Sequence, residues 1–375
     1  MLEGMRTTIA QRMVATGGRP TGFDYMRLML AILIVCWHSV TTSYGQATEF
    51  ERTLLARPVI AVLLPAFFTL SGFLVAGSLE RCKTIGSFVG LRALRIYPAL
   101  AVESLIAALV VGPAMTTMPL GAYFADPQFH AYFLNILGDP HYMLPGVFKT
   151  NPLDAVNGQL WTIPYELRCY VMLTALALLG AVKRPMILLA ATLAYMAWGI
   201  GDTIAHYPFY LTYTAGSAPS WLLLANFLCG VMIYLWRDRI PWRWSWGVAA
   251  LVAALVLYDI PAGHYAAMPL ASYATVFFGL TNPPKTGFLK GADYSYGIYL
   301  YGLIVQQTFM ALAPWGRHWG INIAVSVPAS AAVAALSWHL VEKPALGLKS
   351  QLARLEAKWL SRAAKPAEAS PAVEA

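Results

Sequence analysis

The stretch YMRLMLAILIVCWHSVTT, residues 25–42, is the first long apolar run of the chain and carries Arg27 and His38. Eleven residues advance an α-helix by about three turns, or roughly 16 Å. The two side chains therefore share one face of the predicted helix, with Arg27 at its end and His38 near the middle of a bilayer. An ionisable group at that depth is costly to bury and usually has a function. The stretch predicts a membrane-spanning helix with one functional face.

The composition of the whole chain is that of a membrane protein. Of its 375 residues, 58% are hydrophobic and only 12% are charged, and the mean hydropathy is +0.56. Soluble globular domains carry about twice that share of charge. We therefore predict an all-α integral membrane protein, a bundle of about ten transmembrane helices. The predicted spans, of which the seventh and eighth are short, are 27–46, 57–79, 98–118, 160–181, 185–204, 219–236, 244–259, 266–281, 294–313 and 321–341.

The basic residues predict the orientation of this bundle. An even number of spans places both termini on one side of the membrane. With that side cytoplasmic, 21 of the 26 Lys and Arg residues lie inside, four lie outside and Arg168 lies within a span. This distribution satisfies the positive-inside rule. The net charge of +8 then follows from topology and from contact with anionic lipid head groups, so no nucleic-acid partner is expected.

The chain divides into three predicted parts. Residues 1–22 form a basic cytoplasmic segment, residues 23–346 form the transmembrane domain, and residues 347–375 form a cytoplasmic amphipathic helix on the inner leaflet followed by a disordered tail. The connection 119–159 is rich in aromatic residues, which predicts a folded interfacial segment that roofs a cavity from the outer face. The four cysteines have no paired spacing, so neither a disulfide nor a metal site is expected.

His38 has a structural and a functional interpretation. It is either a packing histidine that is hydrogen-bonded to a neighbouring helix, or a general base, since a neutral imidazole away from bulk water accepts a proton from a hydroxyl nucleophile. The functional interpretation gains weight because Arg27 shares its face. Asp24, three residues before Arg27, is placed to hold the guanidinium in one pose.

Arg92 and Arg95 are three residues apart at the start of the third predicted span, so they also share a helix face. For an isolated pair, ordinary anchoring at the cytoplasmic interface explains them. Together with Arg27 on the same side, however, they provide three guanidiniums, and arginine is preferred over lysine for binding phosphate groups. They are candidates for a polyphosphate site.

Glu166 lies in NGQLWTIPYELRCY, residues 157–170, at the outer end of the fourth predicted span. It either pairs with another helix, or it orients His38 or contacts a polar acceptor. In the second case Asn157, Trp161 and Tyr165 would supply hydrogen bonds and an aromatic platform for a substrate.

Small residues in the second predicted span, Ser71, Gly72 and Ala76, indicate close helix packing. Ser71 would act as a nucleophile only beside a general base, which the sequence does not reveal. Three further intramembrane ionisable residues are interpreted as structural: Glu103, His339 and Glu342.

These motifs together resemble acyltransferase family 3, the bacterial integral-membrane acyltransferases that modify surface polysaccharides and lipopolysaccharide. The resemblance runs from about residue 20 to 346 and is specific because the motifs occur in the family's order. The matching segments are FDYMRLMLAILIVCWHS (23–39), FFTLSGFLVAGSL (67–79), RALRIYP (92–98), NGQLWTIPYELRCY (157–170), DYSYGIYLY (293–301) and WHLVEKPAL (338–346).

The resemblance implies an inner-membrane enzyme with a cytoplasmic acyl-CoA donor and an essential histidine in the first helix, here His38. It also implies that Arg27, Arg92 and Arg95 hold the phosphates of CoA. The chain departs from many relatives at Gly302, where they have a histidine. That difference hints at a subgroup with another acceptor.

The predicted function is transfer of a short acyl group, acetyl first, from acyl-CoA to a carbohydrate hydroxyl of a surface glycan or glycolipid. His38 is the predicted general base and Glu166 orients or senses the acceptor; an acyl-imidazole on His38 is a variant of this scheme. The alternative is a transporter or flippase of a lipid-linked glycan, although no inverted repeat is evident. A third hypothesis is a sensor that binds acyl-CoA without turnover.

Overall fold

The computed structural model of the chain describes residues 7–18, 20–46, 56–207, 219–287 and 291–363. These residues form helices, and the only β-type pairings among them are two isolated bridges, Thr8 with Pro241 and Thr116 with Val147. The predicted all-helical class is confirmed.

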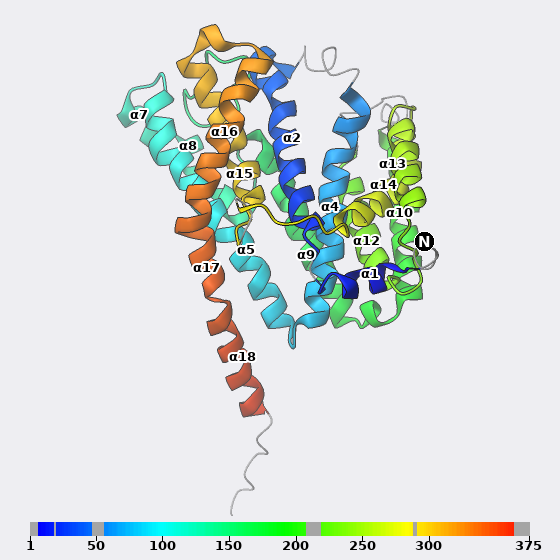
Figure 1. Cartoon of the computed structure of the whole chain (residues 1–375). Coiled ribbons are helices and arrows are strands. Elements are labelled where there is room, and N and C mark those ends of the chain that lie inside the picture. The colour runs from blue at the N-terminus through cyan, green and yellow to red at the C-terminus, as the bar shows by residue number, and fades with distance from the viewer. Residues whose placement is uncertain (1–6, 19, 47–55, 208–218, 288–290, 364–375) are drawn as a thin grey trace, which may run out of the picture.

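Ten helices of 15 or more residues build the body of the bundle (Figure 1). They are α2 (Gly22–Tyr44), α4 (Arg57–Arg81), α5 (Ile85–Ile106), α9 (Ile163–Leu178), α10 (Pro185–His206), α12 (Trp221–Leu235), α13 (Trp244–Tyr258), α14 (His264–Gly279), α15 (Ser295–Leu312) and α16 (Trp319–Ser337). Shorter elements connect or extend them: α1 (Ile9–Ala15), η3 (Ala107–Val111), α6 (Gly112–Met115), α7 (Leu120–Ala125), α8 (Pro127–Tyr132), η4 (Phe133–Leu137), η5 (Gly158–Thr162), η6 (Ala181–Lys183), η8 (Pro314–Gly316), η9 (Trp338–Glu342) and α17 (Lys343–Gly347). A further helix of 15 residues, α18 (Lys349–Ala363), follows α17.

Among the described residues, five helical segments are long and apolar enough to cross a membrane: Gly22–Tyr44, Arg57–Arg81, Ile85–Met115, Pro185–His206 and Trp319–Lys358. The helices α12 and α13 are apolar but shorter. Each of the ten predicted spans overlaps one of the ten long helices. The chain is therefore a helical protein with several candidate spans, while ten crossings and cytoplasmic termini remain predictions.

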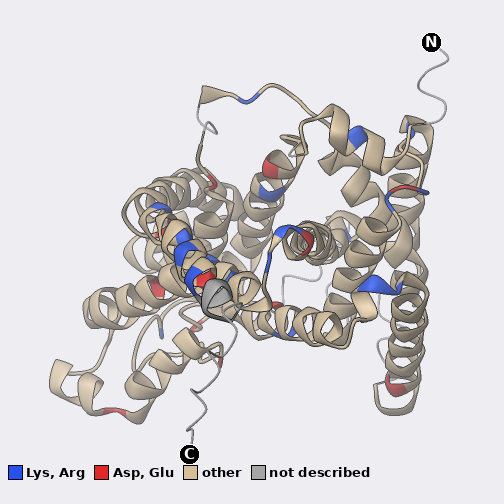
Figure 2. Ribbon diagram, turned by 90° about the horizontal axis from the view of Figure 1, so that it is seen from below, with Lys and Arg blue, Asp and Glu red and all other residues tan. Residues whose placement is uncertain are grey.

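The two ends of the bundle are formed by different elements. In Figure 1, α18 projects from the lower end, and α7 and α8 lie toward the upper end. Viewed from below, Lys and Arg mark α18 and several helix ends and connections around it (Figure 2). The helices α2 and α4 run in opposite directions, so α2 begins in the lower part of the bundle and α4 begins at its upper end.

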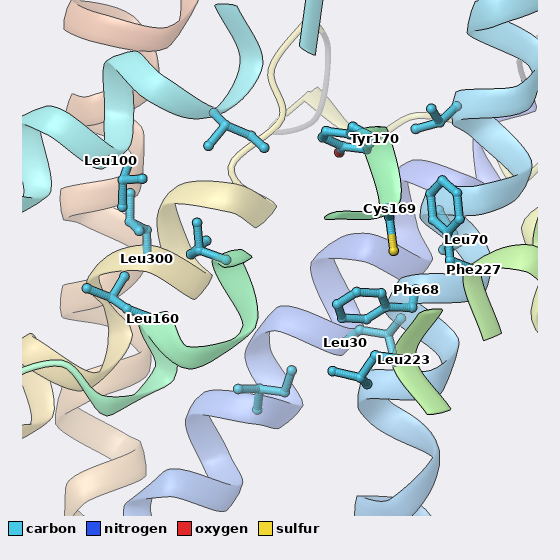
Figure 3. Close-up of a cluster of buried hydrophobic side chains, with 14 of the residues drawn as sticks. Leu30, Phe68, Leu70, Leu100, Leu160, Cys169, Tyr170, Leu223, Phe227 and Leu300 are labelled. Carbon is cyan, nitrogen blue, oxygen red and sulfur yellow. The ribbon is translucent and has the colours of Figure 1, made fainter. Parts of the chain in front are cut away.

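The tightest packing joins α4 to α12. A Cβ atom added to Gly72 would lie 2.0 Å from the Phe227 carbonyl oxygen, and one added to Gly230 would lie 2.1 Å from the Thr69 carbonyl oxygen. Only glycine allows two backbones to approach this closely. The predicted close packing at Gly72 is confirmed, and Phe227 belongs to the buried cluster drawn in Figure 3.

The helix α15 packs on the face of α2 that carries Val35 and Ser39, next to His38. The Gln306 amide donates to the Val35 carbonyl oxygen at 2.7 Å and to Ser39 Oγ at 2.8 Å. A Cβ added to Gly302 would lie 2.6 Å from Val35 Cγ2. The glycine at this position therefore allows α15 to pack closely on α2.

The connection 119–159 is folded, as its aromatic content predicted. The rings of Tyr123, Phe124, Phe129 and Phe133 contact one another with centroids 5.1–5.3 Å apart. The hydroxyl of Tyr123 donates to the Ala108 carbonyl oxygen at 2.7 Å, which ties this aromatic cluster to η3.

The C-terminal helix is also present. Leu352 of α18 packs against Gly90 of α5, and the Thr84 hydroxyl donates to Glu356 at 2.6 Å. Its position on the inner leaflet remains a prediction, and the predicted disordered tail, residues 364–375, lies outside the described residues.

Candidate active site

His38 lines a cavity of about 130 Å³ between α2, α4, α12 and α14. Its imidazole stacks on the neighbouring Trp37 ring, with centroids 5.1 Å apart and planes 18° apart. Within the described part of the chain, no group forms a hydrogen bond with either ring nitrogen of His38. The structural interpretation, a histidine that holds two helices together, therefore finds no support in its contacts.

The cavity lies beside His38, and the α2 residues that line it are Ile34, Trp37 and His38. The helix α4 contributes Ile60 and Leu64, which come from its first turns and hence from its upper end. The helices α4 and α12 run in the same direction, because Thr69 donates to the Asn226 carbonyl oxygen and, further along both helices, the Tyr234 hydroxyl donates to Glu80. The cavity residues of α12 also come from its first turns. The cavity is thus in the upper half of the bundle.

Two polar residues of the cavity wall were not among the predicted site residues. His264, the first residue of α14, is 8% exposed, and its Nε2 is buried without a hydrogen-bond partner among the described residues. Asn226 is 1% exposed; its amide nitrogen donates to the Leu222 carbonyl oxygen at 2.7 Å, but its Oδ1 has no such partner. For both His264 and Asn226, the only signal in the sequence was a single polar residue within an apolar run.

Trp161, a predicted substrate residue, lies where two cavities meet. It lines the His38 cavity and also a second pocket of about 340 Å³. The connection 119–159 supplies Asp139 and Tyr142 to this second pocket. Tyr165, another predicted substrate residue, lines it too, with the Arg168 guanidinium 4.9 Å from its ring centroid. The connection therefore walls a pocket beside the His38 cavity.

Asn157, the third predicted substrate residue, lies elsewhere. It is fully buried, and its amide donates to Glu103 Oε1 at 2.7 Å and to the Leu300 carbonyl oxygen at 2.9 Å. It does not line either of the two pockets. These contacts join α5 to α15 through η5, so Asn157 and Glu103 hold the helices that surround the site.

The lower half of the same helices carries a network of charges. Arg27 and Arg95 both place a guanidinium nitrogen 2.7 Å from Asp293 Oδ2, and Arg95 also lies 3.5 Å from Glu342 Oε2. Burial alone would raise the pKa of Asp293, but the two guanidiniums outweigh it and hold that pKa below its ordinary range. Asp293 was not among the predicted site residues, although it begins one of the family motifs.

The prediction that Asp24 holds the Arg27 guanidinium was wrong. Asp24 lies 2.6 Å from Lys285 Nζ, in an ion pair across the lower end of the bundle, whereas Arg27 pairs with Asp293. Sequence spacing suggested the local carboxylate, but the folded chain brings a closer one from 266 residues away.

Arg92 and Glu166 are linked through Tyr170. The Arg92 guanidinium lies 5.9 Å from the Tyr170 ring centroid and donates to Ser78 Oγ at 3.3 Å. The Tyr170 hydroxyl donates to Glu166 Oε1. Glu166 is absent from the lining of the His38 cavity, so the expected contact that would orient His38 does not occur among the described residues.

No metal-binding arrangement of three or more His, Cys, Asp or Glu residues occurs in the part of the chain that the structure describes. All four cysteines are free. The described residues of the site offer an imidazole, guanidiniums, carboxylates and aromatic rings.

Comparison with known proteins identifies the class. The family model for an acyltransferase domain matches residues 21–342. The chain is 30% identical over 372 residues to nodulation protein 10 of Rhizobium leguminosarum bv. viciae, which covers 90% of this chain and 96% of the relative. It is 26% identical over 332 residues to an O-acetyl transferase of Shigella phage Sf6, covering 86% and 94%. No solved structure matches.

A helical protein with several candidate membrane spans and an acyltransferase domain is a membrane acyltransferase. The chain belongs to acyltransferase family 3, as its motifs predicted.

Proposed function

We propose that the protein transfers a short acyl group, acetyl first, from acyl-CoA to a carbohydrate hydroxyl of a surface glycan or glycolipid at a bacterial inner membrane. The observation that carries this proposal is the position of His38. Its ring faces a cavity with no hydrogen bond from the described residues, and it lies eleven residues from Arg27 on a single helix. The named activity of the phage relative supports acetyl as the group transferred.

In the proposed reaction, His38 takes the proton from the acceptor hydroxyl as the oxygen attacks the thioester carbonyl carbon. The new ester C–O bond forms and the C–S bond breaks. The departing sulfur takes the proton from the imidazolium, so the products are the O-acylated glycan and free CoA. General base catalysis of this kind contributes typically about 10²–10⁴-fold to the rate.

The donor half of the site would be the charged network in the lower part of the bundle. Arg27 and Arg95 are bound to Asp293, but a guanidinium has five N–H donors, so each retains donors for a phosphate oxygen. Arg92 has no carboxylate within ion-pair distance among the described residues. We assign these three arginines to the phosphates of CoA.

Glu166 belongs with this donor half in our proposal. The support for this assignment is its contact with Tyr170, which lies beside Arg92. We therefore assign to it the positioning of Tyr170 and not the orientation of His38.

The test uses the purified full-length protein in lipid nanodiscs. We expect acetyl-CoA to raise its melting temperature. We also expect radiolabel from acetyl-CoA to appear in glycans when membranes from cells that lack the gene are added as acceptor. A transporter of lipid-linked glycans would neither bind nor consume acetyl-CoA, and a sensor would bind it without consuming the thioester, so either result would overturn the proposal.

A further inference from the structure

The cavity beside His38 holds two buried polar atoms that the reaction does not use. They are Asn226 Oδ1 and His264 Nε2, on residues that are 1% and 8% exposed, and neither has a hydrogen-bond partner in the described structure. Buried polar groups in native proteins are almost always satisfied. Because both residues line the cavity, a ligand in it can supply the missing partners.

We propose that this cavity is the acceptor subsite, in which Asn226 and His264 bind hydroxyl groups of the sugar ring that receives the acyl group. The inference rests on the proposed function and deepens it. Asn226 Oδ1 accepts a hydrogen bond from one hydroxyl, and His264 Nε2 donates or accepts one according to its tautomer. A third hydroxyl of the same ring then faces His38.

The rest of the wall suits a sugar ring. Trp37 and Trp161 present aromatic rings and Ile34 and Leu64 present aliphatic groups to the cavity. A pyranose has hydroxyls at its edge and C–H groups on its faces, so it requires a few polar partners within an otherwise apolar wall. The hydrocarbon of an acyl chain would leave Asn226 Oδ1 and His264 Nε2 without partners.

The position of the cavity is consistent with the sugar ring of the acceptor as its occupant. The arginines assigned to CoA lie in the lower half of the bundle, whereas the cavity lies beside His38 in the upper half. None of the three arginines lines it, so the acceptor would occupy a part of the bundle separate from the phosphates of the donor. Trp161 also lines the second pocket, whose Asp139 and Arg168 offer polar groups to the next part of a longer glycan.

The experiment separates acceptor binding from donor binding. Full-length variants in nanodiscs are assayed with labelled acetyl-CoA and a detergent-solubilised glycolipid and glycan extract of the deletion strain. The variants are Asn226→Leu and His264→Phe, which keep shape and remove polarity. His206→Phe is the matched control, because it makes the same change at an exposed histidine that lines neither pocket.

We expect each polar variant to raise the apparent KM for the extract by about three- to tenfold, the effect of one lost neutral hydrogen bond. The KM for acetyl-CoA and the melting shift caused by it should stay within twofold of the unmodified protein. His264→Gln, which restores a polar group, should recover part of the acceptor affinity. His206→Phe should leave both KM values unchanged.

An unchanged acceptor KM in both polar variants would overturn the proposal, and so would a rise confined to the KM for acetyl-CoA, which would assign the cavity to the donor's acyl group. Should either variant fail to fold, Asn226→Ser and His264→Asn provide smaller changes at the same atoms. His38→Ala is run alongside. If it still transfers label, the proposed function itself fails; if it is inactive while the polar variants behave normally, only the acceptor subsite fails.

Discussion

The charged network around Asp293 and the cavity beside His38 share the helix α2 but differ in how their polar groups are paired. In the network, Arg27, Arg95 and Asp293 are paired at 2.7 Å, so the charges largely compensate one another. In the cavity, His38 and Asn226 retain hydrogen-bonding atoms that the described chain leaves unpaired. The shared carboxylate fixes helices relative to one another and leaves the guanidiniums only part of their N–H donors for a ligand, whereas the unpaired polar atoms of the cavity are wholly available to one.

Substitution of the histidine should have the largest effect. We expect His38→Ala to lower kcat by about 10³-fold, within the range for loss of a general base, without a change in melting temperature or in CoA binding. The labelled-transfer assay in nanodiscs measures this. His206→Ala is the control, because that histidine is exposed and its ion-pair partner among the described residues is Asp202, one turn away. A His38→Ala protein with more than a tenth of the normal turnover would contradict the assignment.

Removal of the shared carboxylate should mainly reduce stability. Asp293→Asn leaves Arg27 without its ion-pair partner and Arg95 with Glu342 alone, so we expect a loss of about 3 kcal/mol in the free energy of unfolding, as for a broken buried pair. Denaturant titration in detergent provides the measurement.

Asp154→Asn is the matched control for Asp293→Asn. Its pair with Lys149 is about half exposed, so its loss should cost only about 0.5 kcal/mol. Equal destabilisation by the two variants would show that the network does not stabilise the lower half more than a surface ion pair.

The packing that forms the cavity wall can be tested at α4 and α12. In Gly72→Ala, the new methyl group would meet the Phe227 carbonyl oxygen, and overpacking of this kind costs about 1–3 kcal/mol. Gly121→Ala is the control, since no atom lies within 4 Å of the added Cβ. Thermal unfolding of both variants, followed by the change in tryptophan fluorescence, compares them. Equal melting temperatures would be inconsistent with the close approach of the two backbones.

The smallest effect is expected from a change that keeps the charge. Arg92→Lys removes the planar fork of donors that suits a phosphate, so the KM for acetyl-CoA should rise by about three- to tenfold with little change in kcat. Arg239→Lys, at an exposed arginine, is the control and should behave normally. If Arg92→Lys leaves the donor KM unchanged, Arg92 does not contact the donor.

Much of the fold followed from local sequence. Apolar runs predicted the helices, Gly72 predicted a close helix contact, and the aromatic residues of 119–159 predicted a folded connection. These features depend on neighbours along the chain or on composition, which is why a single sequence contains them. The family followed from the order of the motifs.

The partners within the site did not follow from the sequence. Spacing suggested Asp24 as the partner of Arg27, but Asp293 takes that place, and Glu166 contacts Tyr170 instead of approaching His38. His264 and Asn226 were not anticipated because neither lies at a helical spacing from His38. Each of these contacts joins residues of different helices, or depends on how a helix is rotated in the bundle.

The sequence by itself determined that the chain is a helical membrane protein with Arg27 and His38 on one predicted helix face, because helix periodicity and hydropathy are properties of a single segment. The order of its motifs indicated the acyltransferase family. Only the tertiary structure decided which charges are compensated and which polar atoms remain available, because that depends on which helices pack together. Helix packing pairs the arginines with Asp293 and leaves the cavity beside His38 with polar groups for a ligand to bind.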